Sequence, residues 1–135
     1  MELDPNIQAP LVDLAMQGLE NFIADQGGFT PFALVMFNDG QIQILETSDE
    51  FPDEQSASDA LLQQLLTSKR EGQIVGCLLC SPVVVPSLGA HAVAILQVEG
   101  DSCEPVTLSR QILHASGTPT LADEVTSLPS TSRVF

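Results

Sequence analysis

An almost entirely apolar run, Gln73–Val98, constrains the fold of this chain more than any other feature. It contains two segments rich in β-branched residues, Ile74–Ser81 and Ala90–Val98, with a proline-bounded connection between them. Such segments are typical of β-strands. Strands with so few polar residues are buried on both faces, so other elements must cover them. The run therefore predicts the centre of a sheet with helices packed against it.

Two helices are predicted before this run. Apolar residues recur at three- and four-residue steps in Pro10–Asp25 and again in Ser56–Arg70, which is the spacing of one helix face. Gly72 is expected to end the second helix, because glycine readily adopts the left-handed conformation found after many helices. These two helices are the elements that can cover the sheet.

A β-hairpin is predicted between the helices, in Pro31–Glu46. Asp39–Gly40 has the composition of a two-residue type I′ turn, and such a turn fixes the register of its strands. Phe37 would then lie opposite Ile42. With this register one face carries Ala33, Val35, Phe37, Ile42 and Ile44, and the opposite face carries Leu34, Met36 and Leu45.

The fold class follows from the order of these elements. Val106–Leu113 alternates in the manner of a fifth strand, so the chain predicts a single α+β domain over residues 1–114, in the order α-β-β-α-β-β-β. Its five-stranded, mainly antiparallel sheet has the order 2-1-3-4-5, or 2-1-5-4-3 if Pro82 places the third strand at an edge. Residues 115–135, rich in Ser, Thr and Pro, are predicted to be a C-terminal tail in which 121–128 forms a helical turn or an arm.

Two resemblances accompany this order. The succession of elements over residues 10–113 resembles the roadblock/profilin-like class of regulatory and dimerisation domains. The stretches GGFTPFALVMFNDG (27–40) and GAHAVAILQVEG (89–100) are similar to a family of small bacterial proteins of unknown function. The first resemblance implies a regulatory or dimerisation role, and the second supplies no functional residues.

The charge of the chain limits its partners. Eighteen acidic and four basic residues give a net charge of −14, which disfavours nucleic acid and anionic membrane surfaces. Many of the acids gather in one segment, predicted to be a solvated loop or, alternatively, a docking patch for a basic protein partner: Glu46, Asp49, Glu50, Asp53, Glu54 and Asp59. No secretory signal and no long unbroken apolar segment is recognisable, so a cytoplasmic location is expected.

The residues with chemical potential are few. Cys77 and Cys80 have CxxC spacing, but residues three apart on a strand point to opposite faces, so buried structural thiols are expected. A hairpin centred near Val85–Pro86 would bring Cys80 opposite His91, forming a thiol–imidazole pair in a pocket between the first helix and the sheet. Because no acid is placed to orient the imidazole, a core histidine is the alternative. No metal site or other cofactor is predicted.

The function depends on how the helices cover the sheet. If both lie on one face, Leu34, Met36 and Leu45 remain on an uncovered apolar face, which predicts self-association. If they lie on opposite faces, no apolar face is left over. The sequence favours a non-enzymatic protein-interaction or regulatory module that acts as a homodimer in a bacterial cytoplasm. The alternative is a small-molecule-binding protein or minor enzyme with a pocket near Cys80 and His91.

Overall fold

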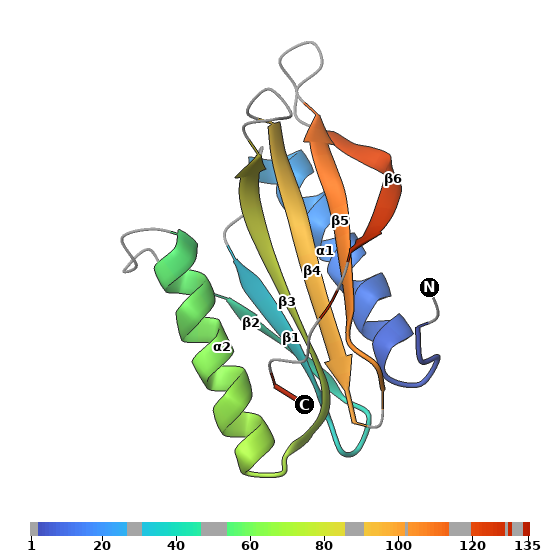
Figure 1. Ribbon diagram of the computed structural model, residues 1–135, viewed down its shortest axis with the longest axis vertical. Coiled ribbons are helices and arrows are strands. Elements are labelled where there is room, and N and C mark those ends of the chain that lie inside the picture. Colours follow the sequence, from blue (N-terminus) through green and yellow to red (C-terminus); the bar gives the residue numbers. More distant parts are fainter. Residues whose placement is uncertain are drawn as a thin grey trace.

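The computed structural model describes residues 3–26, 31–46, 54–85, 91–101, 103–113, 120–128, 130 and 134–135. Two helices and six strands follow one another in the order α1 (Gln8–Gln26), β1 (Phe32–Phe37), β2 (Ile42–Glu46), α2 (Glu54–Arg70), β3 (Ile74–Val85), β4 (His91–Gly100), β5 (Val106–Leu113) and β6 (Thr120–Leu128). The strands form one antiparallel sheet in the order β2-β1-β3-β4-β5-β6 (Figure 1). The predicted α+β class, with two helices and a single antiparallel sheet, is confirmed. The sheet has six strands, not five, and the first of the two predicted orders describes its first five.

The sixth strand lies in the segment predicted to be a tail. β6 pairs with β5 in two stretches, Thr107–Arg110 with Val125–Leu128 and Ile112–Leu113 with Thr120–Leu121. Most of its side chains are exposed, as expected at a sheet edge. An edge strand has little apolar surface to bury, so its sequence carries a weak period-two pattern. The tail prediction was therefore wrong for residues 120–128.

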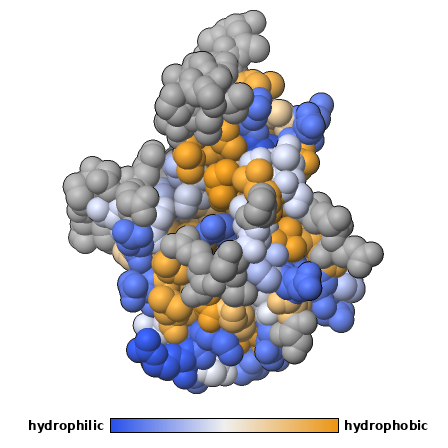
Figure 2. Space-filling model, viewed as in Figure 1, coloured by the Kyte–Doolittle hydropathy of each residue, from blue (hydrophilic) through white to orange (hydrophobic). Residues whose placement is uncertain are grey.

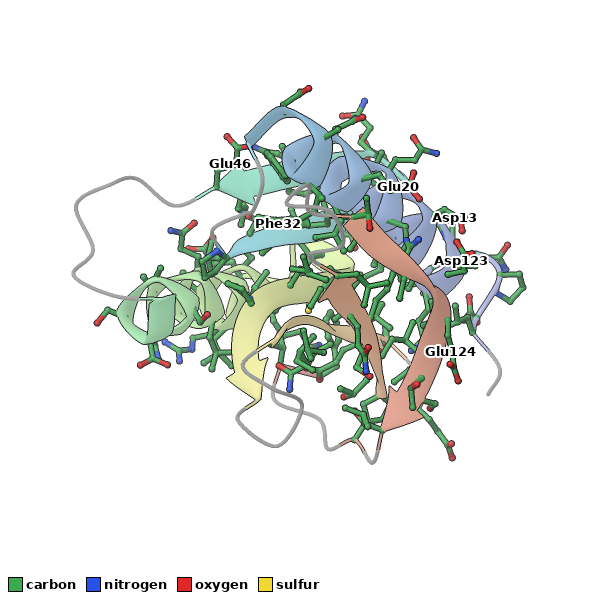
Figure 3. The ribbon with its side chains drawn as sticks, turned by 90° about the horizontal axis from the view of Figure 1, so that it is seen from above. Asp13, Glu20, Phe32, Glu46, Asp123 and Glu124 are labelled. Carbon is green, nitrogen blue, oxygen red and sulfur yellow. The ribbon has the colours of Figure 1, made fainter. Side chains whose placement is uncertain are left out.

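The two helices lie on opposite faces of the sheet, as Figures 1 and 3 show. On the face covered by α1, hereafter the α1 face, the buried cluster comprises Leu11, Val12, Ala15, Leu19, Phe32, Leu34, Met36, Leu78, Cys80, Ala94, Leu96, Val98 and Leu108. On the opposite face, the α2 face, it comprises Ala33, Val35, Leu61, Leu65, Ile74, Cys77 and Leu79. The alternative in which the helices cover different faces is the arrangement observed.

The hairpin of β1 and β2 has a register different from the predicted one. Its connection has three residues rather than two, since the Phe37 amide donates to the Gln41 carbonyl at 2.8 Å. Gly40 has a φ of 88°, as a three-residue turn ending in a left-handed residue requires. Met36 consequently lies opposite Ile42, so the shift by one residue moves β2 side chains to the other face. The face predicted to carry Phe37 together with Ile42 does not exist.

The turn that leads into α1 packs over β3 near its start and β4 near its end. Asp4 caps this turn, because its Oδ1 accepts hydrogen bonds from the amides of Asn6 and Ile7 at 2.9 Å each. Ile7 then lies over Gly76 of β3 and Gly100 of β4, which are register partners. A Cβ on Gly100 would come within 2.8 Å of the Ile7 side chain, so the glycines allow this close approach.

Pro82 lies within β3, opposite Ala94 of β4. β1 pairs with β3 only as far as Cys80, so β3 has no β1 partner at Pro82. At that point β3 is an edge, which is where a residue without an amide hydrogen fits a sheet. The third strand is thus central over its first half and an edge over its second half.

Candidate functional site

The predicted pairing of Cys80 with His91 is wrong. In the observed register Cys80 lies opposite Leu96, and His91 lies opposite Val85 near the other end of the hairpin. His91 lies five positions before Leu96 on β4, which corresponds to about 17 Å along a strand. The side chain of His91 and the residues around His114 lie outside the described part of the structure.

The thiols of Cys77 and Cys80 are buried on opposite faces, as predicted from their spacing. Their exposed fractions are 2% and 0%, respectively. Burial raises the pKa of both thiols far above the ordinary value of 9.0, and the negative charge of Glu99 adds to the effect at Cys77. Because the thiolate is the nucleophilic form, burial lowers the reactivity of both thiols in the folded protein.

The structure separates the residues of the predicted apolar interface. Leu34 and Met36 are buried beneath α1, with exposed fractions of 1% and 5%. Leu45 is half-buried on the α2 face. The predicted interface residues therefore pack within one chain. The centre of the acidic segment, residues 47–53, lies outside the described part.

The α2 face is covered by a helix over only part of its width. α2 packs against β1 and β3, whereas α1 packs against β1, β3, β4 and β6 on the other side. Figure 2 views the α2 face and shows hydrophobic residues over the upper part of the sheet and along α2. Beyond β3, a shallow depression of about 280 Å³ crosses β4, β5 and β6, with a mixed polar and apolar lining.

Val134 and Phe135 pack between α2 and the sheet (Figure 1). Both pack against the α2-face cluster, and Figure 1 shows this end of the chain between α2 and β3. The Phe135 ring lies beneath the ammonium group of Lys69 on α2, 4.9 Å from Nζ to the ring centroid. We call the position defined by Lys69, Glu99 and the α2-face cluster the Glu99 slot.

The carboxylate of Glu99 provides the polar contacts of the slot. Its Oε1 accepts hydrogen bonds from two successive backbone amides, those of Val134 at 3.1 Å and Phe135 at 3.2 Å. Glu99 is only 5% exposed, and a buried carboxylate must be compensated by hydrogen bonds. A second attachment lies nearby, where the Thr107 hydroxyl bonds to that of Ser130 at 2.7 Å. Polar groups on β4 and β5 thus hold a segment that lies outside the sheet.

The sequence prediction missed this slot, although one signal pointed to it. Glu99 ends a run of apolar residues on β4, and its register partner is the buried Cys77. A carboxylate on an otherwise buried face requires a donor. Two donors to Glu99 lie 35 and 36 residues further along the chain, so no local pattern could identify them.

Comparisons with protein-family models, with curated proteins and with solved structures found no match to this chain. The seven elements predicted from the sequence are followed here by an eighth, β6. No helix in the described ranges is both long and apolar enough to cross a membrane. Among the same residues, His, Cys, Asp and Glu side chains form no group of three that could hold a metal ion.

Proposed function

We propose that this protein is a protein-interaction module whose Glu99 slot binds an extended segment of a partner protein. The observation that carries the proposal is the way in which the chain's own Val134 and Phe135 fill the slot. They are attached as a short peptide would be, through two backbone amides on one buried carboxylate and an aromatic side chain beneath a cation. In this proposal, the chain's own Val134 and Phe135 stand in for the partner segment.

The chemistry of the slot defines the partner. Contacts from Glu99 to backbone amides are available to any residue except proline, so they support affinity without reading the sequence. Specificity comes from the apolar cluster and from Lys69, which favours an aromatic ring through a cation–π contact. We expect the partner to present an exposed segment with an aliphatic residue followed by an aromatic one.

In this proposal the chain's own segment competes with the partner. When an internal segment fills a site, the apparent affinity for an external ligand falls in proportion to the fraction of open sites. A partner must therefore bind more tightly than residues 130–135, or the segment must first leave. Binding would then be coupled to release of Val134 and Phe135 from the α2 face.

The test uses a fluorescently labelled peptide with the sequence of residues 130–135 and measures anisotropy. Phe135→Ala should open the slot, so that this variant binds the peptide at least about tenfold more tightly than the unaltered chain, a difference of about 1.4 kcal/mol. Adding Glu99→Gln should weaken this binding. Glu124→Gln, an exposed carboxylate on β6, is the matched control and should leave it unchanged.

A folded Phe135→Ala variant that binds no peptide would overturn the proposal. If that variant does not fold, hydrogen exchange on the unaltered chain decides. Amides of Val134 and Phe135 that exchange well before those of β3 and β4 indicate a segment that leaves a folded domain. Exchange of all these amides together would make the segment an integral part of the core and contradict a binding site.

A further inference from the structure

A groove of about 310 Å³ lies on the α1 face, away from the Glu99 slot, between α1 and the edge strand β6. Its walls are Ile23 and Ala24 of α1 and Leu121 of β6, and charged groups stand among them: Arg110, Glu20 and Asp123. A volume near 300 Å³ is at the small end of the range for ligand sites. The groove therefore fits a ligand of few atoms.

Arg110 is the cation of this groove, and the fold holds it in position. β6 bulges where it passes Arg110, because the register of β5 and β6 shifts between Arg110 and Ile112. The guanidinium Nε donates to the Ala122 carbonyl at the bulge, at 2.6 Å. Nη1 reaches Met16 Sδ at 3.6 Å and Glu20 Oε1 at 3.5 Å. The Arg110 side chain is 12% exposed.

The guanidinium retains hydrogen-bonding capacity. An arginine has five N–H donors, and Nη2 carries two of them. Within the described residues Nη2 of Arg110 has no acceptor, whereas Nε and Nη1 are both bonded. Because Arg110 lines the groove, these donors are suited to bind a carboxylate there.

Two carboxylates stand beside Arg110 in the groove. Glu20, on α1, is 59% exposed, and its contact with Arg110 at 3.5 Å is long for an ion pair. Asp123 is exposed on β6, and Figure 3 shows it on the side of α1, whereas its neighbour Glu124 points to the other side of the strand. With one cation and two carboxylates, the groove carries a net negative charge.

We propose that this groove binds a small zwitterion, namely an α-amino acid with an apolar side chain. The ligand carboxylate would bond to Arg110, the ammonium group to Asp123 and Glu20, and the apolar side chain would lie against Ile23, Ala24 and Leu121. A simple anion would meet two carboxylates in a protein of net charge −14, and a simple cation would leave the Arg110 donors unused. A zwitterion satisfies both signs of charge.

The test titrates the full-length protein with L-leucine and follows binding by calorimetry and by amide chemical shifts. Two analogues remove one charge each: L-leucinamide lacks the carboxylate, and 4-methylpentanoate lacks the ammonium group. Each should bind about ten- to a hundredfold more weakly than leucine, the range expected when a hydrogen bond to a charged group is lost. Shifted amides should belong to α1, β5 and β6.

Matched variants locate the site. Asp123→Asn should weaken leucine binding, whereas Glu124→Gln, on the other side of β6, should not. Arg110→Gln should abolish binding, with Arg70→Gln in the exposed last turn of α2 as its control. Because Arg110 also bonds to the bulge, Asp123→Asn remains the decisive variant if Arg110→Gln does not fold.

No binding of leucine or of any other apolar amino acid at millimolar concentration would overturn the proposal. Equal binding of 4-methylpentanoate would do the same, since it would mean that the carboxylates are not used. Shifts confined to the α2 face would place the ligand elsewhere and also contradict it. None of these results bears on the peptide assay, because the Glu99 slot lies on the opposite face.

Discussion

The two faces of the sheet are closed in different ways. α1 crosses its face from β1 to β6, and the cluster beneath it extends from Phe32 on β1 to Leu108 on β5. α2 packs mainly against β1 and β3, and Val134 and Phe135 cover a further part of its face. A helix covers the α1 face, whereas Val134 and Phe135, bonded to Glu99, cover part of the α2 face. On the face that a helix covers less completely, contacts made by a short segment of the chain can be replaced by contacts with another molecule.

The largest loss of stability is expected from a substitution on the α1 face. Leu34→Glu should cost more than about 4 kcal/mol of the free energy of unfolding, because it buries an unpaired charge. Leu34 lies opposite Ile44, which is 46% exposed, so Ile44→Glu is the matched control and should change stability by about 0.5 kcal/mol or less. Urea unfolding measures both values. A Leu34→Glu variant that folds normally but has half the mass in light scattering would reinstate the predicted self-interface.

A smaller effect should appear in the dependence of stability on pH, since each face buries one thiol. Burial raises the pKa of Cys77 and Cys80 above the ordinary value of 9.0. Above that pH the unfolded chain loses these protons and the folded chain keeps them, so the free energy of unfolding should fall with rising pH. The slope should be about 1.4 kcal/mol per pH unit for each thiol.

Unfolding curves between about pH 8 and pH 10 measure that slope, and Cys77→Ala and Cys80→Ala should each reduce it. If only Cys80→Ala changes the slope, the thiol on the α2 face is less protected, and the difference between the two faces is larger than the static structure indicates. A stability that does not change above pH 9 would contradict the burial of both thiols.

Phe135→Ala should have a more modest effect that distinguishes the faces directly. Phe135 is half-buried, so its truncation should cost about 1–2 kcal/mol, less than at a fully buried phenylalanine. Opening of the slot should speed the reaction of Cys77, on the α2 face, with a thiol reagent by at least about tenfold. Cys80, beneath α1, should react as slowly as before.

Mass spectrometry after timed labelling gives both rates, in a Cys103→Ser background because Cys103 is only half-buried. Equal acceleration at Cys77 and Cys80 would indicate global destabilisation and not a local opening of the α2 face.

The smallest change in stability is expected from a substitution in the groove between α1 and β6. Glu20→Gln removes the 3.5 Å contact with Arg110, but Glu20 is 59% exposed, and an exposed ion pair contributes about 0–1 kcal/mol. Thermal unfolding should therefore change little, while leucine affinity should fall. A large loss of stability would show that Glu20 supports the fold of α1 and not a ligand.

Much of the architecture could be predicted from local patterns. The helical spacing of Leu61 and Leu65, the apolar composition of β3 and β4 and the alternation of β5 are short-range properties. Each element formed at or near its predicted position, although β3 continues four residues beyond Ser81, to Val85. The hairpin register was wrong because Asn38-Asp39-Gly40 is compatible with loops of two or three residues. β6 was missed because an exposed edge strand has a weak apolar pattern.

The candidate sites were less predictable. Cys80 and His91 were singled out by an assumed hairpin centre, and the observed register separates them. Arg110 was recognised as part of an alternating strand, but its position beside Glu20 depends on how α1 crosses the sheet. Glu99, a carboxylate on a buried strand, indicates that hydrogen-bond donors must lie nearby, yet the amides of Val134 and Phe135 are far away in the sequence.

The sequence by itself determined the α+β class, the two amphipathic helices and the central apolar strands, because periodicity and composition act over a few residues. Only the tertiary structure decided which face each helix covers, how the strands are registered and what pairs with Glu99 and Arg110. Those outcomes depend on contacts between residues distant in the chain. One added loop residue moves the side chains of a strand to the other face of the sheet, and a helix can pack on either side of a sheet.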